Sequence, residues 1–293
     1  MQFRCWLYSL ALAFWIAIVP ARAERPPTIP AEGTSCRVSS AELESFVRQT
    51  FVSGIPFGEV RSFSRCQWAP TLLLELLGKP SETEYADNIV FTLGMMGRIE
   101  AIDGLIRFLE TGDGGAALSY QAYQAKSDVL IALGCILNQT DLELDGRDVE
   151  RINTAPAASL QAAHDRVFAY LRAGLLDPSQ WSKVGWKGPF PSDFDRNVYL
   201  TKKTVMGLSL SGDSKVQCYL EWAKDHLEMG PQAGLLMDRC GFRPAHPNTW
   251  GREHLARRDL VQLERLLDDA TAVNSEIAKY PRGLADYYSQ APK

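Results

Sequence analysis

The chain has 293 residues, of which 46% are apolar and 23% charged, and its 31 Lys and Arg residues against 35 Asp and Glu residues give a formal charge of −4. This is the composition of an ordinary globular protein, and it excludes a disordered or collagen-like chain. The mildly acidic balance argues against non-specific nucleic-acid binding, which needs clustered Lys and Arg side chains.

The first 23 residues have the three-part pattern of a secretory signal peptide. Arg4 supplies the positive start, residues 5–19 are almost wholly apolar, and Ala21-Arg22-Ala23 is a small-x-small cleavage site. Because the apolar run is shorter than the ~20 residues that span a bilayer, a signal peptide is favoured over a membrane anchor. The sequence predicts a periplasmic or secreted protein with no stable membrane span after cleavage.

The remaining chain predicts helices almost throughout. Residues 24–35 are rich in Pro and small polar residues, as is typical of a flexible arm. Ser39 and Glu42 then form a capping-box pattern at the start of a helix. Helical spacing of apolar residues, or a helix-compatible pattern, follows over 70–77, 85–96, 102–109, 129–137, 157–173, 193–210, 214–227, 231–238 and 252–278. No convincing period-2 run indicates a strand, so the predicted fold class is all-α.

Three segments share a short core in which a leucine precedes a small residue. The equivalent positions are Leu93-Gly94, Leu133-Gly134 and Leu208-Ser209, so the leucines lie 40 and 75 residues apart. Helix pairs that repeat at about 40–47 residues are the signature of HEAT and armadillo solenoids. The small residues would let neighbouring helices approach closely. We therefore predict an α-α superhelix of antiparallel helix pairs.

The sequence resembles exported bacterial HEAT-repeat proteins of uncharacterised role. The shared features are the Gly54-Ile55-Pro56-Phe57 loop, the Leu72–Leu77 helix and the Asn88–Gly97 core. The likeness covers residues 70–138, is weaker over 193–227 and is absent beyond residue 228, and the usual Asp and Arg positions of HEAT repeats are mostly missing. The predicted layout is a signal peptide at 1–23, an arm at 24–35, a capping helix and loop at 36–69, repeats at 70–227 with an insertion at 175–194, and capping helices at 228–293.

The insertion is rich in aromatic residues, with Trp181, Trp186, Phe190 and Phe194 among several Gly and Pro residues. Such a loop is either a recognition surface, because aromatic residues dominate interface energetics, or a plug that covers the interior of the repeats. The plug is favoured, since exposed apolar patches of that size are uncommon. If the loop binds a partner, these four side chains are the candidate binding residues.

The pairing of the cysteines is predicted from the expected export and from the number of cysteines. Without the signal peptide five cysteines remain, an odd count, in an oxidising compartment. Cys135 lies in the most apolar sequence, in a helix that is apolar on both sides, and is expected to be free and buried. The other four predict the disulfides Cys36–Cys66 and Cys218–Cys240, one near each end of the array. The alternative is that some of these thiols are reduced and merely buried.

The sequence holds no recognisable catalytic or metal-binding motif. HExxH, GxSxG, P-loop and βαβ GxGxxG patterns are absent. The four histidines, His164, His226, His246 and His254, lack metal-ligand spacing and are expected to be exposed residues of loops and helix starts. We therefore predict no metal, no cofactor and no enzymatic activity.

Two functions remain open. The leading hypothesis is an exported HEAT-like scaffold that binds a protein or peptide partner through its concave face, because solenoids present extended concave surfaces. The alternative is an enzyme, or an accessory to one, that acts on a cell-envelope polymer through an acid and histidine site near Glu253 and His254.

Cleavage after Ala23 yields a mature chain that begins at Glu24. N-terminal sequencing of protein recovered from the periplasm or the medium checks this expectation. A membrane-bound product that still begins at Met1 would contradict it.

Overall fold

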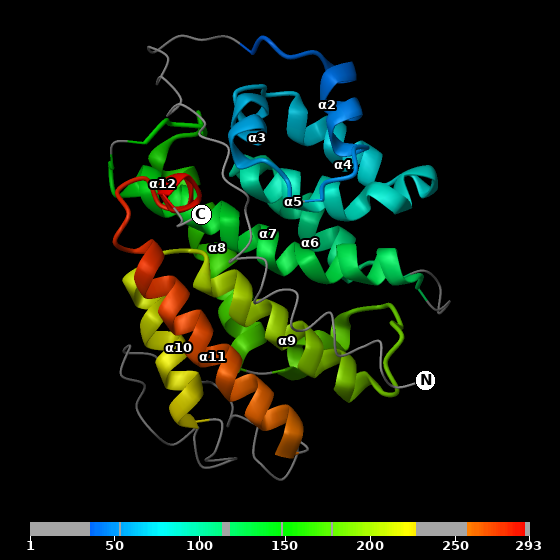
Figure 1. The fold of residues 1–293 in the computed structure, drawn as a ribbon, viewed down its shortest axis with the longest axis vertical. Helices are drawn as coiled ribbons and strands as arrows, with labels where there is room; N and C mark the ends of the chain where they lie inside the picture. The colour runs from blue at the N-terminus through cyan, green and yellow to red at the C-terminus, as the bar shows by residue number, and fades with distance from the viewer. Residues whose placement is uncertain are drawn as a thin grey trace.

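The computed structural model describes residues 36–52, 54–112, 118–147, 149–176, 178–226 and 257–290. Across these ranges the fold is helical and contains no β-strand, which confirms the predicted class (Figure 1). The α-helices are α2 (Ser40–Val47), α3 (Phe57–Ser64), α4 (Ala69–Leu77), α5 (Ala86–Met96), α6 (Ile102–Glu110), α7 (Tyr120–Leu144), α8 (Ala157–Leu176), α9 (Asp193–Ser209), α10 (Ser214–His226), α11 (Arg257–Ile277) and α12 (Leu284–Gln290). Short 3-10 helices are η1 (Pro80–Tyr85), η2 (Ile99–Ala101) and η3 (Pro178–Lys183).

Local sequence chemistry sets several helix ends. At the start of α2 the Glu42 backbone N–H donates to the Ser39 hydroxyl, and the Glu42 carboxylate accepts from the Ser39 backbone N–H at 2.7 Å. This is the predicted capping box. Helix α5 is capped at its C-terminal end by Gly97, whose φ of 72° lies in the left-handed region that favours glycine.

The helices from α5 onward pack in two layers. In one layer α5, α7, α9 and α11 follow one another, each packed against the next. In the other, α6 packs on α7, α8 packs on both α7 and α9, and α10 packs on α9 and α11. Figure 1 shows the long helix α7 running through the middle of the molecule and α10 beside α11 at the lower end.

Helices of the first layer run parallel in a nearly constant register. Contacts between α7 and α9 join Gln124 to Tyr199, Asp128 to Lys203, and Asn138 to Ser211 just beyond α9, which are separations of 75, 75 and 73 residues. Because both residue numbers rise together along the two helices, the helices point the same way. The separation matches the 75 residues between the aligned leucines Leu133 and Leu208.

The same relation holds between α5 and α7. Gly94 faces Ala132 and Gly97 faces Gln139, which are separations of 38 and 42 residues. These values bracket the 40-residue interval between the first two repeated segments. The repeated segments of the sequence therefore lie side by side in space.

Backbones within this layer approach closely at glycines. A Cβ atom on Gly94 would lie 2.5 Å from the Cα of Ala132, and one on Gly134 would overlap the carbonyl oxygen of Gly207. The expectation that Gly94 and Gly134 lie at close helix contacts is confirmed. In the third segment Gly207, two positions before the aligned Ser209, makes such a contact with α7, because a Cβ atom added there would overlap the Leu130 carbonyl oxygen.

Helix α7 is the centre of the hydrophobic core. Its apolar stripe and the opposite side are both buried, as predicted; the residues are Val129, Leu130, Ile131, Leu133, Cys135, Ile136 and Leu137. Cys135 is a free buried thiol, and burial raises its pKa to about 12, so the expected inert cysteine is confirmed.

At the N-terminal end a disulfide joins Cys36 to Cys66, with the two Cα atoms 4.9 Å apart, which confirms the first predicted pair. Cys218 in α10 is also disulfide-bonded. Cys240 lies outside the described residues, as do the segments 1–35 and 231–238, so the pairing of Cys218 with Cys240 stays a prediction.

Helix α12 was not anticipated as a separate element. It packs against α3, where the rings of Tyr288 and Phe57 lie 5.3 Å apart, and its first residue Leu284 donates its backbone N–H to the Asn138 side chain. The C-terminal end therefore returns to the N-terminal part of the fold. None of the helices in the described ranges is both long and apolar enough to cross a membrane.

Replacing Gly134 by Ala is expected to destabilise the protein, because the new methyl group meets backbone atoms of α9 that move only with the helix. Overpacking of this kind costs about 1–3 kcal/mol. The matched control is Gly58→Ala in α3, where an added Cβ meets no atom within 4 Å. Urea unfolding compares the two variants, and equal stability of Gly134→Ala and Gly58→Ala would contradict close helix packing at this point.

Candidate functional site

The structure separates the four aromatic residues of the insertion into two buried and two accessible side chains. Trp181 donates its indole N–H to the Thr201 hydroxyl at 3.1 Å, and Trp186 donates to the Leu109 carbonyl oxygen at 2.7 Å. Both indoles are buried with their only donor satisfied, as the plug interpretation expects. Phe190 is half-buried and Phe194 is 45% exposed, so these two remain candidates for partner contact.

Phe190 packs with three tyrosine rings near the N-terminal ends of α7 and α9. We call this group of four rings the aromatic cluster. Its rings are those of Tyr120, Tyr123, Phe190 and Tyr199. Adjacent ring centroids lie 5.1–5.7 Å apart along the series from Tyr120 to Tyr199. Tyr120 is 53% exposed, so the cluster extends from the protein interior to the surface. It combines accessible aromatic area with phenolic hydroxyl groups.

A row of three ionisable groups lies next to this cluster. Asp87 of α5, Asp128 of α7 and Lys203 of α9 lie on three successive parallel helices, and the Lys203 ammonium donates to the Asp128 carboxylate. The Lys203 and Asp128 side chains are almost completely buried. One Asp87 oxygen, Oδ1, is buried without a hydrogen-bond partner. Burial, followed by the charge of Asp128, raises the pKa of Asp87 to about 8, so this carboxyl carries a proton at neutral pH.

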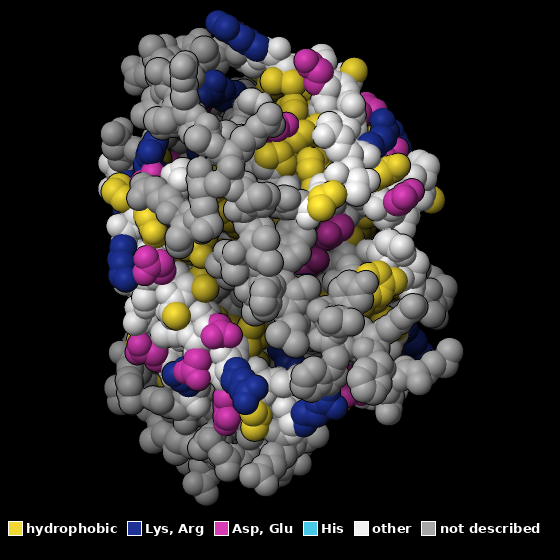
Figure 2. All heavy atoms as spheres, in the orientation of Figure 1, with side chains coloured by type: hydrophobic (Ala, Val, Ile, Leu, Met, Phe, Trp, Pro, Cys, Tyr) yellow, Lys and Arg dark blue, Asp and Glu magenta, His cyan; other side chains and the backbone are white. Residues whose placement is uncertain are grey.

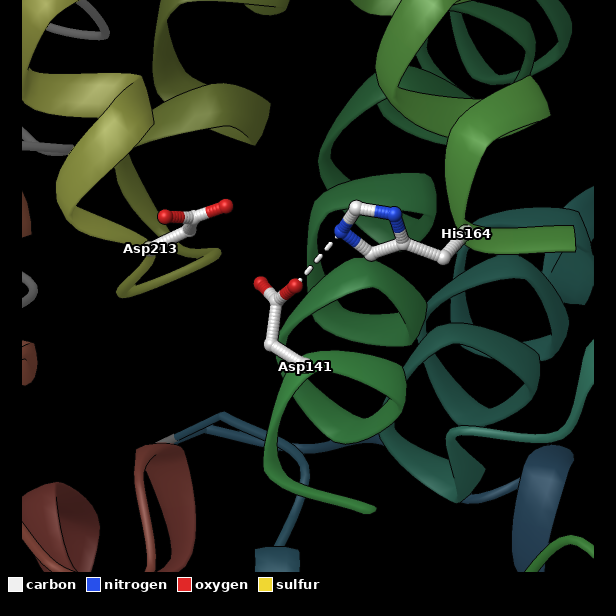
Figure 3. Close-up of side chains that lie close together, drawn as sticks. All are labelled: Asp141, His164 and Asp213. Atoms are coloured by element: carbon white, nitrogen blue, oxygen red, sulfur yellow. Dashed lines mark ion pairs between the residues drawn. The ribbon is translucent and has the colours of Figure 1, made fainter. Parts of the chain in front are cut away.

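A second polar group gathers side chains from three separate elements (Figure 3). Asp141 lies near the end of α7, His164 lies in α8, and Asp213 lies in the turn between α9 and α10. The Asp141 Oδ1 and His164 Nε2 atoms are 2.6 Å apart, and one oxygen of Asp213 completes a set of three ligand atoms within 4.8 Å of one another. Figure 3 shows the Asp213 carboxylate facing the other two side chains.

The imidazole is held from both sides. His164 Nδ1 lies 3.0 Å from Asp165 Oδ1, which also accepts from the Gln161 side chain at 2.8 Å. Burial opposes protonation of His164, but the hydrogen bond and the charge of Asp141 outweigh it and raise the pKa of the imidazole to about 9. Burial raises the pKa of Asp141 to about 6. At neutral pH the two groups therefore form an ion pair, and the imidazolium is not a general base.

Sequence reasoning missed this group, and it expected His164 to be exposed. The structure corrects that expectation, because His164 is buried within α8. The three residues are 23 and 49 positions apart, so no spacing motif connects them. The proposed acid and histidine region at Glu253 and His254, together with His246, lies outside the described residues.

Two shallow hollows lie beside α2. One, of about 550 Å³, is lined by residues of α2 and its C-terminal end, and the other, of about 600 Å³, lies between α2 and α4. Both are open, whereas small-molecule sites enclose most of their ligand. Neither contains a residue of the aromatic cluster or of the Asp141 group.

Substitution of Asp87 by Asn tests the protonated carboxyl. The pKa of Asp87 is about 8 in the folded protein and about 4 in the unfolded chain, so the folded state binds the proton more tightly. The bound proton therefore stabilises the folded state fully below about pH 4, and this stabilisation is lost as the pH rises towards 8. Between pH 5 and 8 the loss of this proton should lower the unfolding free energy of the wild-type protein by at most about 1.4 kcal/mol per pH unit. Asp87→Asn should flatten that decline in urea unfolding, whereas the exposed control Asp269→Asn should follow wild type. Parallel pH profiles for wild type and Asp87→Asn would refute the assignment.

Comparison of the chain with known proteins finds no matching protein family, no significantly similar curated protein and no significantly similar solved structure.

Proposed function

We propose that the protein is an exported HEAT-like scaffold that binds a protein or peptide partner and carries out no reaction of its own. The single observation that supports this most is the in-register parallel packing of α5, α7 and α9, with the 40- and 75-residue separations of the sequence repeat. In a solenoid the second helices of successive pairs stack in this way. The pairs would be α4 with α5, α6 with α7, α8 with α9, and α10 with α11.

The aromatic cluster is the proposed contact surface. It lies at the N-terminal ends of α7 and α9, which are second helices of two neighbouring pairs in this arrangement, where the first turn of α7 reaches the surface. Tyr120 of the cluster, together with Phe194 at the start of α9, supplies accessible aromatic area, which is typical of binding hot spots. The cluster suits an apolar side chain of a protein or peptide.

The surface charge supports a partner that is not a polyanion, and the disulfide supports export. Figure 2 shows Lys and Arg side chains interspersed with Asp and Glu on one face of the molecule, an arrangement that does not favour a polyanionic partner. The disulfide between Cys36 and Cys66 is compatible with an oxidising compartment outside the cytoplasm. This agrees with the secretory signal pattern of the first 23 residues.

The test is capture of the partner by the tagged mature chain, cross-linked in its native envelope, followed by affinity measurements with the identified partner. Tyr120→Ser and Phe194→Ser should each weaken binding by more than about tenfold, as expected for aromatic anchors. Both side chains are substantially exposed, so these variants should retain the wild-type melting temperature.

The matched control is Val52→Ser, which removes an exposed apolar side chain from another part of the fold. It should bind like wild type. Failure to capture a specific partner, equal loss of binding in Val52→Ser, or turnover of an envelope polymer by the purified chain would each overturn the proposed function.

A further inference from the structure

The group formed by Asp141, His164 and Asp213 has the donor set of a metal site. Two carboxylates and one imidazole contribute one ligand atom each, and these three atoms lie within 4.8 Å of one another. Mixed imidazole and carboxylate sets suit zinc and related transition metals, whereas Mg²⁺ and Ca²⁺ prefer sites made of oxygen atoms alone. Zinc bonds to such ligands are about 2.0–2.2 Å long. Ligand atoms bound to one such ion lie closer together than 4.8 Å, so the proposed site draws its three ligand atoms together on binding.

Besides the ion pair between Asp141 and His164, two observations indicate that this group binds a ligand. The second oxygen of Asp141, Oδ2, is buried and has no hydrogen-bond partner. Asp165 holds the far nitrogen of His164, Nδ1, at 3.0 Å, and leaves Nε2 directed at the other two ligands. A carboxylate that holds the second nitrogen of a ligating histidine is the usual outer support of a metal-bound imidazole.

The third ligand is positioned by its own turn. Asp213 receives the backbone N–H of Lys215 on its Oδ1 at 2.8 Å, and its backbone N–H donates to the Ser211 hydroxyl at 3.2 Å. These bonds fix the turn that carries the carboxylate at the start of α10. A buried polar oxygen, an oriented imidazole and an anchored third donor thus converge from three elements.

We propose that Asp141, His164 and Asp213 bind one zinc-type divalent cation, which links the end of α7, the helix α8 and the turn before α10. On binding, the Nε2 proton of His164 is released to solvent and the nitrogen lone pair bonds to the metal, while both carboxylates coordinate in ionised form. Three protein ligands leave the fourth position of a tetrahedron for water. The proposal does not depend on the scaffold function, because it requires no partner.

Zinc binding is tested on the tag-free mature chain after chelator treatment, by calorimetric titration with Zn²⁺ and by thermal unfolding with and without it. One equivalent should bind and raise the melting temperature, because a ligand of the folded state stabilises it. Co²⁺ should produce the visible spectrum of a tetrahedral site with nitrogen and oxygen ligands.

Asp213→Asn should lower the Zn²⁺ affinity at least tenfold and abolish the melting shift, while the metal-free protein remains folded because Asn also caps helices well. Asp165→Asn, which removes the support and not a ligand, should weaken binding by about 10–100-fold. The matched control is Asp145→Asn, with the same loss of charge one turn further along and an exposed side chain; it should bind like wild type.

Absence of a Zn²⁺-dependent heat and melting shift in the wild-type chain would overturn the proposal. So would wild-type affinity in Asp213→Asn, because zinc would then bind elsewhere. Equal stabilisation by Mg²⁺ or Ca²⁺ would overturn the assignment to a zinc-type ion. None of these outcomes bears on partner capture, so the two proposals fail independently.

Discussion

The architecture depends on the close backbone contact of α7 with its neighbours. Gly134 of α7 lies against Gly207 of α9 so tightly that no Cβ fits between them, and Gly94 of α5 lies against Ala132 on the other side. Interaxial distance is set by the side chains at the contact, and small residues permit the shortest one. The flanking leucines then fill the layer on both sides of α7, which is why this helix is buried all round. A larger residue at any of these points would shift a whole helix and every contact beyond it.

Polar pairs set the register of the helices that the glycines bring together. Asp128 meets Lys203 toward one end of the α7–α9 contact, and Asn138 donates to the Ser211 carbonyl oxygen at the other end, at 2.7 Å. A slip of α9 along α7 would leave these groups buried without partners, and breaking a buried ion pair in this way costs about 3–5 kcal/mol. Close packing therefore supplies the contact, and buried polar groups select one register from those that packing alone permits. Asp87 adds a protonated carboxyl to the same row.

The ends of the helices near Asn138 collect the features most suited to function or regulation. Asn138 accepts from Leu284 of α12, and Asp141 lies one turn further along α7 beside His164. The turn after α9 supplies Asp213 to the same region. The proposed cation would join three elements at this point. The aromatic cluster lies toward the opposite ends of α7 and α9, so the proposed partner surface and the proposed metal site are separate.

The sequence by itself determined the helical class, the capping box at Ser39, the buried character of α7 and the identity of Gly94 and Gly134 as contact residues. The first three properties depend on residue type and on spacings of three to four positions, which are local along the chain. The two glycines were identified from the repetition of one short segment along the chain. Even the disulfide between Cys36 and Cys66 was predicted, from the expected export, the cysteine count and the position of this pair near one end of the array, although the sequence could not place residue 36 over its loop. Only the tertiary structure decided that Gly207 meets α7, that Trp181 and Trp186 point inward, and that α12 returns to α3. The proximity of Asp141, His164 and Asp213 was likewise decided only by the tertiary structure, because these residues come from three elements and share no motif. Their proximity arises from the stacking of helices that are distant in sequence, and no local pattern records which ends of those helices coincide.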